Sequence, residues 1–148
     1  MLMRLCTVGF SGKSARVFFE LLREAGIQRL VDIRLHNTNQ LAGFTKKDDL
    51  AYFLHALCGI AYLHEPLLAP TEEMLREVRK AGKRGWAVYE RDFVRLLSER
   101  NLDERLPDLL LSVPTVMLCS EPTAEHCHRR LVAEYLAERV PGVEIVHL

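Results

Sequence analysis

The sequence predicts an α/β domain with a mostly parallel sheet of about four or five strands and helices on both faces. Short runs that are apolar along their whole length alternate with amphipathic segments of helical length, the pattern of strands buried on both sides. The 148 residues suit one domain, and 49% hydrophobic with 27% charged residues are ordinary globular values. No repeat or linker divides the chain, so we expect a single domain over residues 1–148.

The elements follow in order along the chain. Strands are expected at residues 5–8, 30–33, 60–63, 115–119 and 143–146, and helices at 13–25, 46–58, 70–82, 88–100 and 124–140. Gly26 ends the first helix, whose N-cap is Ser11 or Ser14, and Thr45 with Asp48 forms a capping box for the second. Ligands of such folds bind outside the carboxyl ends of the strands, here the loops 9–14, 34–44, 64–68 and 120–126.

Composition excludes some classes of function. Lys+Arg and Asp+Glu number 20 each, so no overall field attracts a nucleic acid, which leaves nucleic-acid binding open but unsupported. No apolar run is long enough for a membrane span, and no signal-peptide pattern is found. We therefore expect a cytoplasmic protein with reduced thiols, in which Cys6 and Cys58 are small core residues.

The first loop ends in Gly12-Lys13-Ser14, like a phosphate-binding loop, but Thr7 stands where that motif needs its first glycine. Two interpretations remain. The backbone N–H groups of Gly9, Ser11 and Gly12 bind one anion at a helix N-terminus, or the loop is a tight turn.

Asp32 and Arg34 end the second strand and point to the same side of the sheet. They form a structural ion pair, or Arg34 binds an anionic group while Asp32 orients it. The polar run 36–40, which includes Asn37, suits either a polar ligand or a solvated turn.

The segment 119–130 carries two cysteines and two histidines. Cys119 is a candidate nucleophile at a strand end, as in rhodaneses, although Glu125 occupies the position where a cysteine phosphatase has its arginine. Cys119, Cys127 and a histidine have the right atoms for a metal, but the spacing is not that of a zinc half-site, and we assign no metal ligand.

A third interpretation combines Glu121, His128 and Arg129 at a helix N-terminus. His128 falls near the centre of the apolar face of the last helix, one turn before Leu131, and should point at the strand ends. It is a general acid or base oriented by Glu121 or Asp32, or else a hydrogen-bonded core histidine.

A basic run at residues 76–84 precedes Trp86 and Tyr89. Glutamates lie at helical spacing among these charges, which favours a solvated helix face over a nucleic-acid surface.

Four motifs together resemble the domain of unknown function 488 family: Thr7-Val8-Gly9-x-Ser11, Val31-Asp32-Ile33-Arg34, Cys119-Ser-Glu121 with Cys127-His128-Arg129, and Val146-His147-Leu148. The resemblance covers nearly the whole chain and implies a small bacterial or archaeal α/β domain of unestablished activity. It departs from the common pattern at Phe10, where a histidine is frequent, and at residues 35–41, which lack a proline and a Ser-Arg pair.

We therefore expect a small anionic or nucleotide-like ligand at the carboxyl edge of the sheet, with no cofactor identified. The alternatives are a non-catalytic module for nucleic acid or protein, in which these residues fill a solvent-free cluster, and a metal-binding or rhodanese-like thiol protein. The expected catalytic residues are His128, Glu121 and Cys119, and the expected ligand-binding residues are Thr7, Gly9, Ser11, Asp32, Arg34, Asn37, Cys127 and Arg129.

Overall fold

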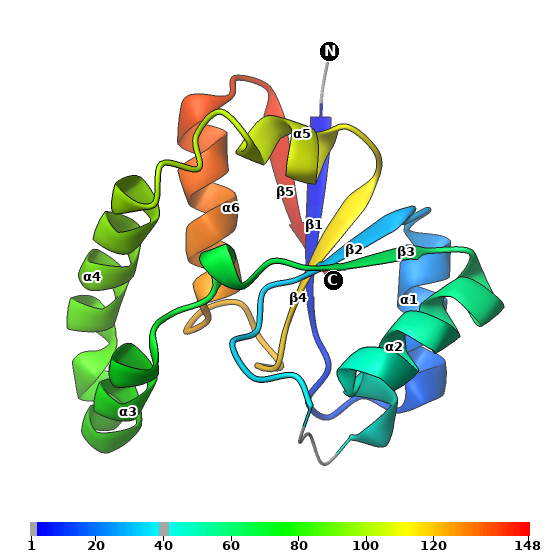
Figure 1. Ribbon diagram of the computed structural model, residues 1–148, viewed down its shortest axis with the longest axis horizontal. Helices are drawn as coiled ribbons and strands as arrows, with labels where there is room; N and C mark the ends of the chain where they lie inside the picture. Colours follow the sequence, from blue (N-terminus) through cyan, green and yellow to red (C-terminus); the bar gives the residue numbers. More distant parts are fainter. Residues whose placement is uncertain (1–2, 39–41) are drawn as a thin grey trace.

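The computed structural model describes residues 3–38 and 42–148, and within them it contains one five-stranded sheet (Figure 1). The strands are β1 (Met3–Gly9), β2 (Arg29–Asp32), β3 (Ala61–His64), β4 (Thr115–Cys119) and β5 (Val143–His147). Their order is β3-β2-β4-β1-β5, and every pairing is parallel. The predicted α/β fold class is confirmed.

Helices cover both faces of the sheet (Figure 1). They are α1 (Ala15–Glu24), α2 (Lys47–Phe53), α3 (Glu72–Ala81), α4 (Trp86–Glu99), α5 (Leu106–Leu111) and α6 (His128–Arg139). One core lies under α1 and α2, and a second lies under α4, α5 and α6, with α3 packed at its margin. No helix of the described residues has both the length and the apolar character needed to cross a membrane.

The central strand β4 is buried along its whole length and serves both cores. Val116 and Leu118 belong to the core beneath α1, whereas Met117 belongs to the core beneath α6, because alternate side chains of a strand point to opposite faces. This double burial is why its sequence is apolar throughout rather than alternating.

The last helix begins later than its sequence predicts. α6 starts at His128 rather than at residue 124, and Cys127 occupies its N-cap in an extended conformation (φ −139°, ψ 139°). Glu125 O, within the segment expected to be helical, accepts from Arg130 Nε (3.2 Å), and the carbonyl groups of the loop before it also have other partners. Ser120 O accepts from Ser11 N–H (3.0 Å), and Glu121 O accepts from Arg129 Nη1 (2.6 Å).

One of the predicted helix caps is confirmed and one is wrong. Ser14 caps α1 by accepting from Val17 N–H (3.2 Å), and Thr71 caps α3 in the same way. The capping box at Thr45 is wrong, because its hydroxyl donates to Ala42 O (2.8 Å) and α2 has no side-chain cap. The short helix α5 was not predicted, since six residues give too little periodicity to detect.

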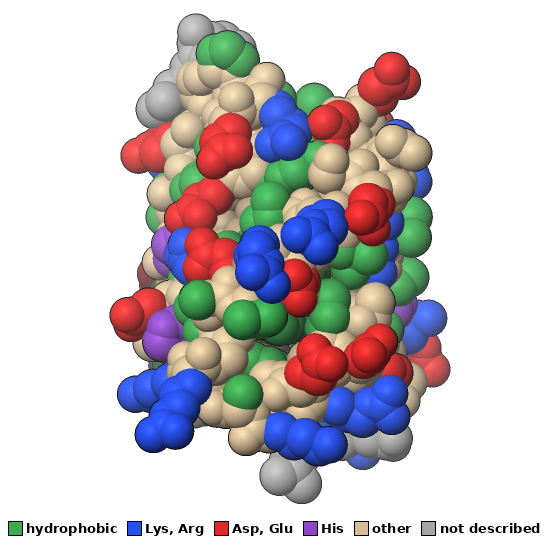
Figure 2. Space-filling model, turned by 90° about the vertical axis from the view of Figure 1, so that its left-hand side faces the viewer, with side chains coloured by type: hydrophobic (Ala, Val, Ile, Leu, Met, Phe, Trp, Pro, Cys, Tyr) green, Lys and Arg blue, Asp and Glu red, His purple; other side chains and the backbone are tan. Residues whose placement is uncertain are grey.

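The outer face formed by α3 and α4 is strongly charged. Figure 2 shows lysine and arginine side chains interspersed with acidic ones over this face, with hydrophobic side chains between them. All the side chains of α3 are at least partly exposed. This mixture of signs agrees with the solvated helix face expected for residues 76–84 and offers no continuous basic surface.

Candidate functional site

The topology places a crevice between β2 and β4. From β2 the chain continues through α2 to β3 at one edge of the sheet, and from β4 it continues through α6 across the other face to β5 at the opposite edge. Neighbouring strands whose connections leave in opposite directions have an open space at their carboxyl ends, where α/β proteins bind ligands. Asp32 pairs with Leu118, so the residues that follow, Arg34 and Cys119, flank this space.

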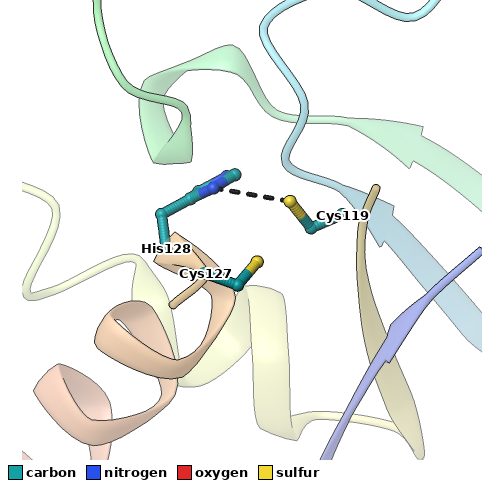
Figure 3. Close-up of side chains that lie close together, drawn as sticks. All are labelled: Cys119, Cys127 and His128. Carbon is teal, nitrogen blue, oxygen red and sulfur yellow. Dashed lines mark hydrogen bonds between the residues drawn. The ribbon is translucent and has the colours of Figure 1, made fainter. Parts of the chain in front are cut away.

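Cys119, Cys127 and His128 meet at this point (Figure 3). Cys119 ends β4, while Cys127 and His128 begin α6, and both point back toward Cys119. Cys119 Sγ lies 3.5 Å from His128 Nδ1. The three side chains are buried, with relative exposures of 4%, 2% and 7%. The predicted aim of His128 toward the strand ends is therefore confirmed.

The hydrogen bonds of His128 fix its tautomer. Nε2 lies 2.8 Å from Ile33 O, and a carbonyl oxygen only accepts, so Nε2 carries a proton. Nδ1 is then left facing the Cys119 sulfur, either as an acceptor from the thiol or as the second N–H of an imidazolium beside a thiolate. Both ring nitrogens have partners, so neither Glu121 nor Asp32 orients the ring, contrary to the expectation from the sequence.

The surroundings favour the thiolate. The pKa of Cys119 is lowered well below its ordinary value. The largest cause is a hydrogen bond from the Cys127 thiol, which outweighs the opposing effect of burial. The charge of His128 and the backbone N–H of Glu121 lower the pKa further. Burial lowers the pKa of His128, but the adjacent Cys119 reverses this, and the net direction is upward. The hydrogen bond to Cys119 and burial raise the pKa of Cys127, which stays a thiol. These directions favour a thiolate on Cys119 beside a protonated His128, with the Cys127 thiol as a hydrogen-bond donor to Cys119.

Arg34 and Asp32 form a buried bidentate ion pair. Nε and Nη2 of Arg34 each donate to an Asp32 oxygen at 2.8 Å, and Nη2 also donates to Thr45 O (2.7 Å). Tyr62 OH (2.6 Å) and Asn37 Nδ2 (3.3 Å) donate to Asp32 Oδ2. This network agrees with the structural ion pair considered from the sequence, and it assigns Asp32 and Asn37 to holding Arg34 in place.

One donor of this network has no partner. Arg34 Nη1 is the single buried side-chain nitrogen or oxygen atom without a hydrogen bond within the described ranges 3–38 and 42–148. A buried guanidinium N–H that binds nothing is costly, and Arg34 also lines the cavity described next. An unpaired guanidinium N–H is a group that anionic or polar ligands bind.

The cavity has a volume of about 510 Å³ and lies between the carboxyl ends of β2 and β4 and the helices α3 and α4. The predicted site residues that line it are Arg34, Cys119, Glu121, Cys127 and His128. Sequence reasoning placed His126 in a ligand-binding loop, but it did not connect four other lining residues with this site: Arg79, Lys83, Trp86 and Tyr89. Trp86 stacks on Tyr89 (5.1 Å between ring centroids) and also contacts His126. Cationic and aromatic groups thus surround the two sulfurs.

Four other residues that were predicted to bind a ligand do not line the cavity, and they instead contact the loop after β4 or one another: Thr7, Gly9, Ser11 and Arg129. Arg129, 1% exposed, donates from Nε to Thr7 Oγ1 (3.1 Å) and from Nη1 to Glu121 O. Gly9 packs so closely on the loop after β4 that an added Cβ would lie 1.6 Å from Glu121 O. Ser11 N–H is bonded to Ser120 O. The anion site proposed for this first loop is therefore wrong at Ser11, whose N–H is already used.

The possible metal-donor atoms of Cys119, Cys127 and His128 are also close enough to bind one metal ion together. Cys119 Sγ, Cys127 Sγ and a ring nitrogen of His128 lie within 4.8 Å of one another. The N–H···O bond from His128 Nε2 to Ile33 O leaves Nδ1 to face the sulfurs, and metal-binding histidines make the same kind of bond through their other ring nitrogen.

Comparison with known proteins gives one match. The model of the family described as domain of unknown function DUF488 matches residues 14–136. This span includes the Asp32-x-Arg34 and Cys119-to-Arg129 motifs but not the Thr7-to-Ser11 motif. No curated protein and no solved structure matches the chain. Because the match covers most of its length, the chain belongs to the DUF488 family.

Proposed function

We propose that the protein is an enzyme that uses Cys119 as a nucleophile on a small anionic substrate bound between β2 and β4. The observation that carries this proposal is the contact between Cys119 Sγ and His128 Nδ1 on the wall of a cavity that Arg34 also lines. A nucleophilic thiol needs a partner that removes its proton and a substrate site in front of it.

The roles follow from the geometry. His128 takes the thiol proton and returns it to the leaving group, while the bond to Ile33 O keeps the ring in place. The start of α6 adds its dipole, which favours negative charge on Cys119. Arg34 binds the anionic group, and the exposed Arg79 and Lys83 attract it to the opening. The Glu121 side chain is exposed and lines the same cavity, where it selects among substrates by repelling additional negative charge.

The proposal is favoured over a non-catalytic binding module by the presence of the cavity. In a purely structural hydrogen-bond network, these side chains would fill their own space and every donor would be paired. Here about 510 Å³ lies beside the cluster, and Arg34 Nη1 is unpaired. On the face formed by α3 and α4, basic and acidic side chains are interspersed, so this face gives no continuous basic surface for a nucleic acid (Figure 2).

Alkylation by iodoacetate and by iodoacetamide tests the proposal, because the two reagents differ in one negative charge. Peptide mass spectrometry then gives the rate at each cysteine. We expect Cys119 to react faster than the other cysteines with both reagents near neutral pH. The ratio of its rate with iodoacetate to its rate with iodoacetamide should be higher than that of a free thiol. Cys6 and Cys58 are internal controls, since burial raises the pKa of each.

Two variants separate the parts of the claim. His128→Asn should slow alkylation of Cys119 by both reagents, whereas Lys83→Gln should reduce only the preference for iodoacetate. A Cys119 that reacts no faster than Cys58, or that is unaffected by His128→Asn, would contradict the nucleophile assignment.

A metal centre is the second candidate function, favoured by the three donor atoms within 4.8 Å. Elemental analysis of the purified protein would show one bound metal per chain, lost in Cys127→Ser and retained in Cys58→Ser. Metal-free protein that takes up no zinc on titration would remove this candidate.

A further inference from the structure

We infer that Cys127 is a resolving cysteine, which closes a reversible disulfide with Cys119 after Cys119 has reacted with a hydroperoxide. This inference rests on the proposed nucleophilic role of Cys119 and names the class of substrate for it. The two sulfurs and His128 Nδ1 lie within 4.8 Å of one another, and both sulfurs line the same cavity. A second thiol this close is what a cysteine oxidised by a peroxide needs to form a disulfide.

Of the other three cysteines, only Cys127 is placed to form a disulfide with Cys119. Cys6 and Cys58 belong to the core beneath α1 and α2, across the sheet from the cavity. Cys127 is the extended N-cap of α6 and its side chain makes no capping hydrogen bond, so rotation of this side chain breaks no hydrogen bond of the helix. Formation of the disulfide requires the two sulfurs to approach from within 4.8 Å to about 2.05 Å.

The reaction balances with the groups present. The Cys119 thiolate attacks one oxygen of the hydroperoxide, the O–O bond breaks, and Cys119 becomes a sulfenic acid. The departing hydroxide or alkoxide takes the Nδ1 proton of His128, while the unpaired Arg34 Nη1–H stabilises its negative charge. The sulfur is thereby oxidised by two electrons and the O–O bond is reduced.

Resolution uses the same histidine. Neutral His128 now accepts the proton of Cys127, whose sulfur attacks Cys119 and forms the S–S bond. The hydroxide released from the sulfenic acid takes this proton and leaves as water. An external dithiol then reduces the disulfide by thiol–disulfide exchange, is itself oxidised, and restores both cysteines.

Titration of the reduced protein with hydrogen peroxide tests this inference. We expect the number of free thiols to fall from the four in the sequence to two, and non-reducing digestion to yield one linked peptide pair containing Cys119 and Cys127. Dithiothreitol should restore all four. Cys127→Ser and Cys127→Ala should instead stop at a Cys119 sulfenic acid that dimedone traps, whereas Cys58→Ser should lose two thiols like the natural protein.

Failure of this inference differs from failure of the proposed function. If Cys119 alkylates rapidly but peroxide yields no Cys119–Cys127 link, or the natural protein accumulates the dimedone adduct as much as Cys127→Ser does, the resolving role is wrong and the nucleophile stands. If Cys119 reacts slowly with alkylating agents as well, both are wrong. A stoichiometric metal that keeps both thiols unoxidised in peroxide would also overturn the resolving role and favour the metal centre.

Discussion

Arg34 is fixed by partners on two of its three nitrogens and unpaired on the third. Nε and Nη2 are bound by Asp32 and Thr45 O, while Nη1 has no bond. The ion pair thus determines which N–H remains for a ligand. A lysine at this position would carry the same charge on a single nitrogen. It could not bind Asp32 through some nitrogens and leave another N–H for a ligand, as the planar guanidinium group does.

Asp32→Asn should destabilise the fold by about 3–5 kcal/mol, because it leaves the Arg34 charge buried without a counter-charge. Denaturant unfolding measures this loss. Tyr62→Phe is the matched control, since it removes one hydrogen bond to the same carboxylate and should cost about 1 kcal/mol. Equal effects of the two changes would show that the charge is not the main contribution.

The same pair predicts a pH dependence of stability. Burial opposes ionisation of Asp32, but the bonds and charge of Arg34 outweigh it, so the net pKa is lowered. Stability from this group is therefore present above the ordinary pKa of an aspartate and is lost as the pH falls through the lower, folded-state pKa. The slope of unfolding free energy against pH in the acid range should be smaller in Asp32→Asn than in the natural protein.

Gly9→Ala should destabilise the protein by about 1–3 kcal/mol or more, since the added methyl group meets the Glu121 carbonyl and Arg129. Gly43→Ala is the matched control, since no atom of the described residues lies within 4 Å of the added Cβ, and it should change stability little. Thermal unfolding of both variants checks this, and similar melting temperatures would be inconsistent with the close approach of the two loops.

The sequence was informative about which residues belong to this edge of the sheet and less so about what each one does. Thr7, Gly9 and Arg129 resemble ligand-binding residues in sequence, because polar groups and glycine at strand ends serve ligands and supporting contacts equally well. Only the long-range bonds from Arg129 to Thr7 and Glu121 O distinguish the two roles. The unpaired Arg34 Nη1 likewise depends on contacts with residues distant in the sequence.

At the scale of the elements, α3 and α4 form one side of the site. Both helices follow β3 in the chain, and α4 lies beside α6 (Figure 1). Val78, Trp86 and Tyr89 of these helices line the cavity. Their amphipathic pattern could be read from the sequence. Which residues face the cavity could not, because helical periodicity gives the buried side of a helix without naming what it is buried against.

Thr71→Ala should cost about 1 kcal/mol by removing the cap of α3, whose first turn Thr71 Oγ1 stabilises through Met74 N–H. Thr71→Ser keeps the acceptor and should behave like the natural protein. Hydrogen exchange at Met74 and Leu75 measures the fraying of this turn. Unchanged protection in Thr71→Ala would mean that tertiary packing, and not the cap, holds the start of α3.

At the scale of the whole molecule, the two cores share one sheet. β4 contributes to both, and β1 is paired on either side with β4 and β5. We therefore expect one cooperative unfolding transition with equal calorimetric and van't Hoff enthalpies, as for a single domain. Two separate transitions, or an enthalpy ratio well above one, would show that the two faces unfold independently.

The order of the strands also fixes the position of the site. Arg34 and Cys119 are far apart in the sequence, and they meet because β2 and β4 are neighbours with connections that diverge. The sequence predicted parallel strands and hence a shared carboxyl edge, but strand order depends on which faces pack together and was not accessible from local patterns.

The central claim, that Cys119 is a thiolate paired with His128, is tested most directly by the pH dependence of Cys119 alkylation. The rate should remain high well below the pH at which an ordinary thiol loses reactivity, because the pKa of Cys119 is lowered by the Cys127 thiol and His128. In His128→Asn the midpoint should move to higher pH. A Cys119 midpoint at or above that of a free cysteine, unchanged by His128→Asn, would contradict the account.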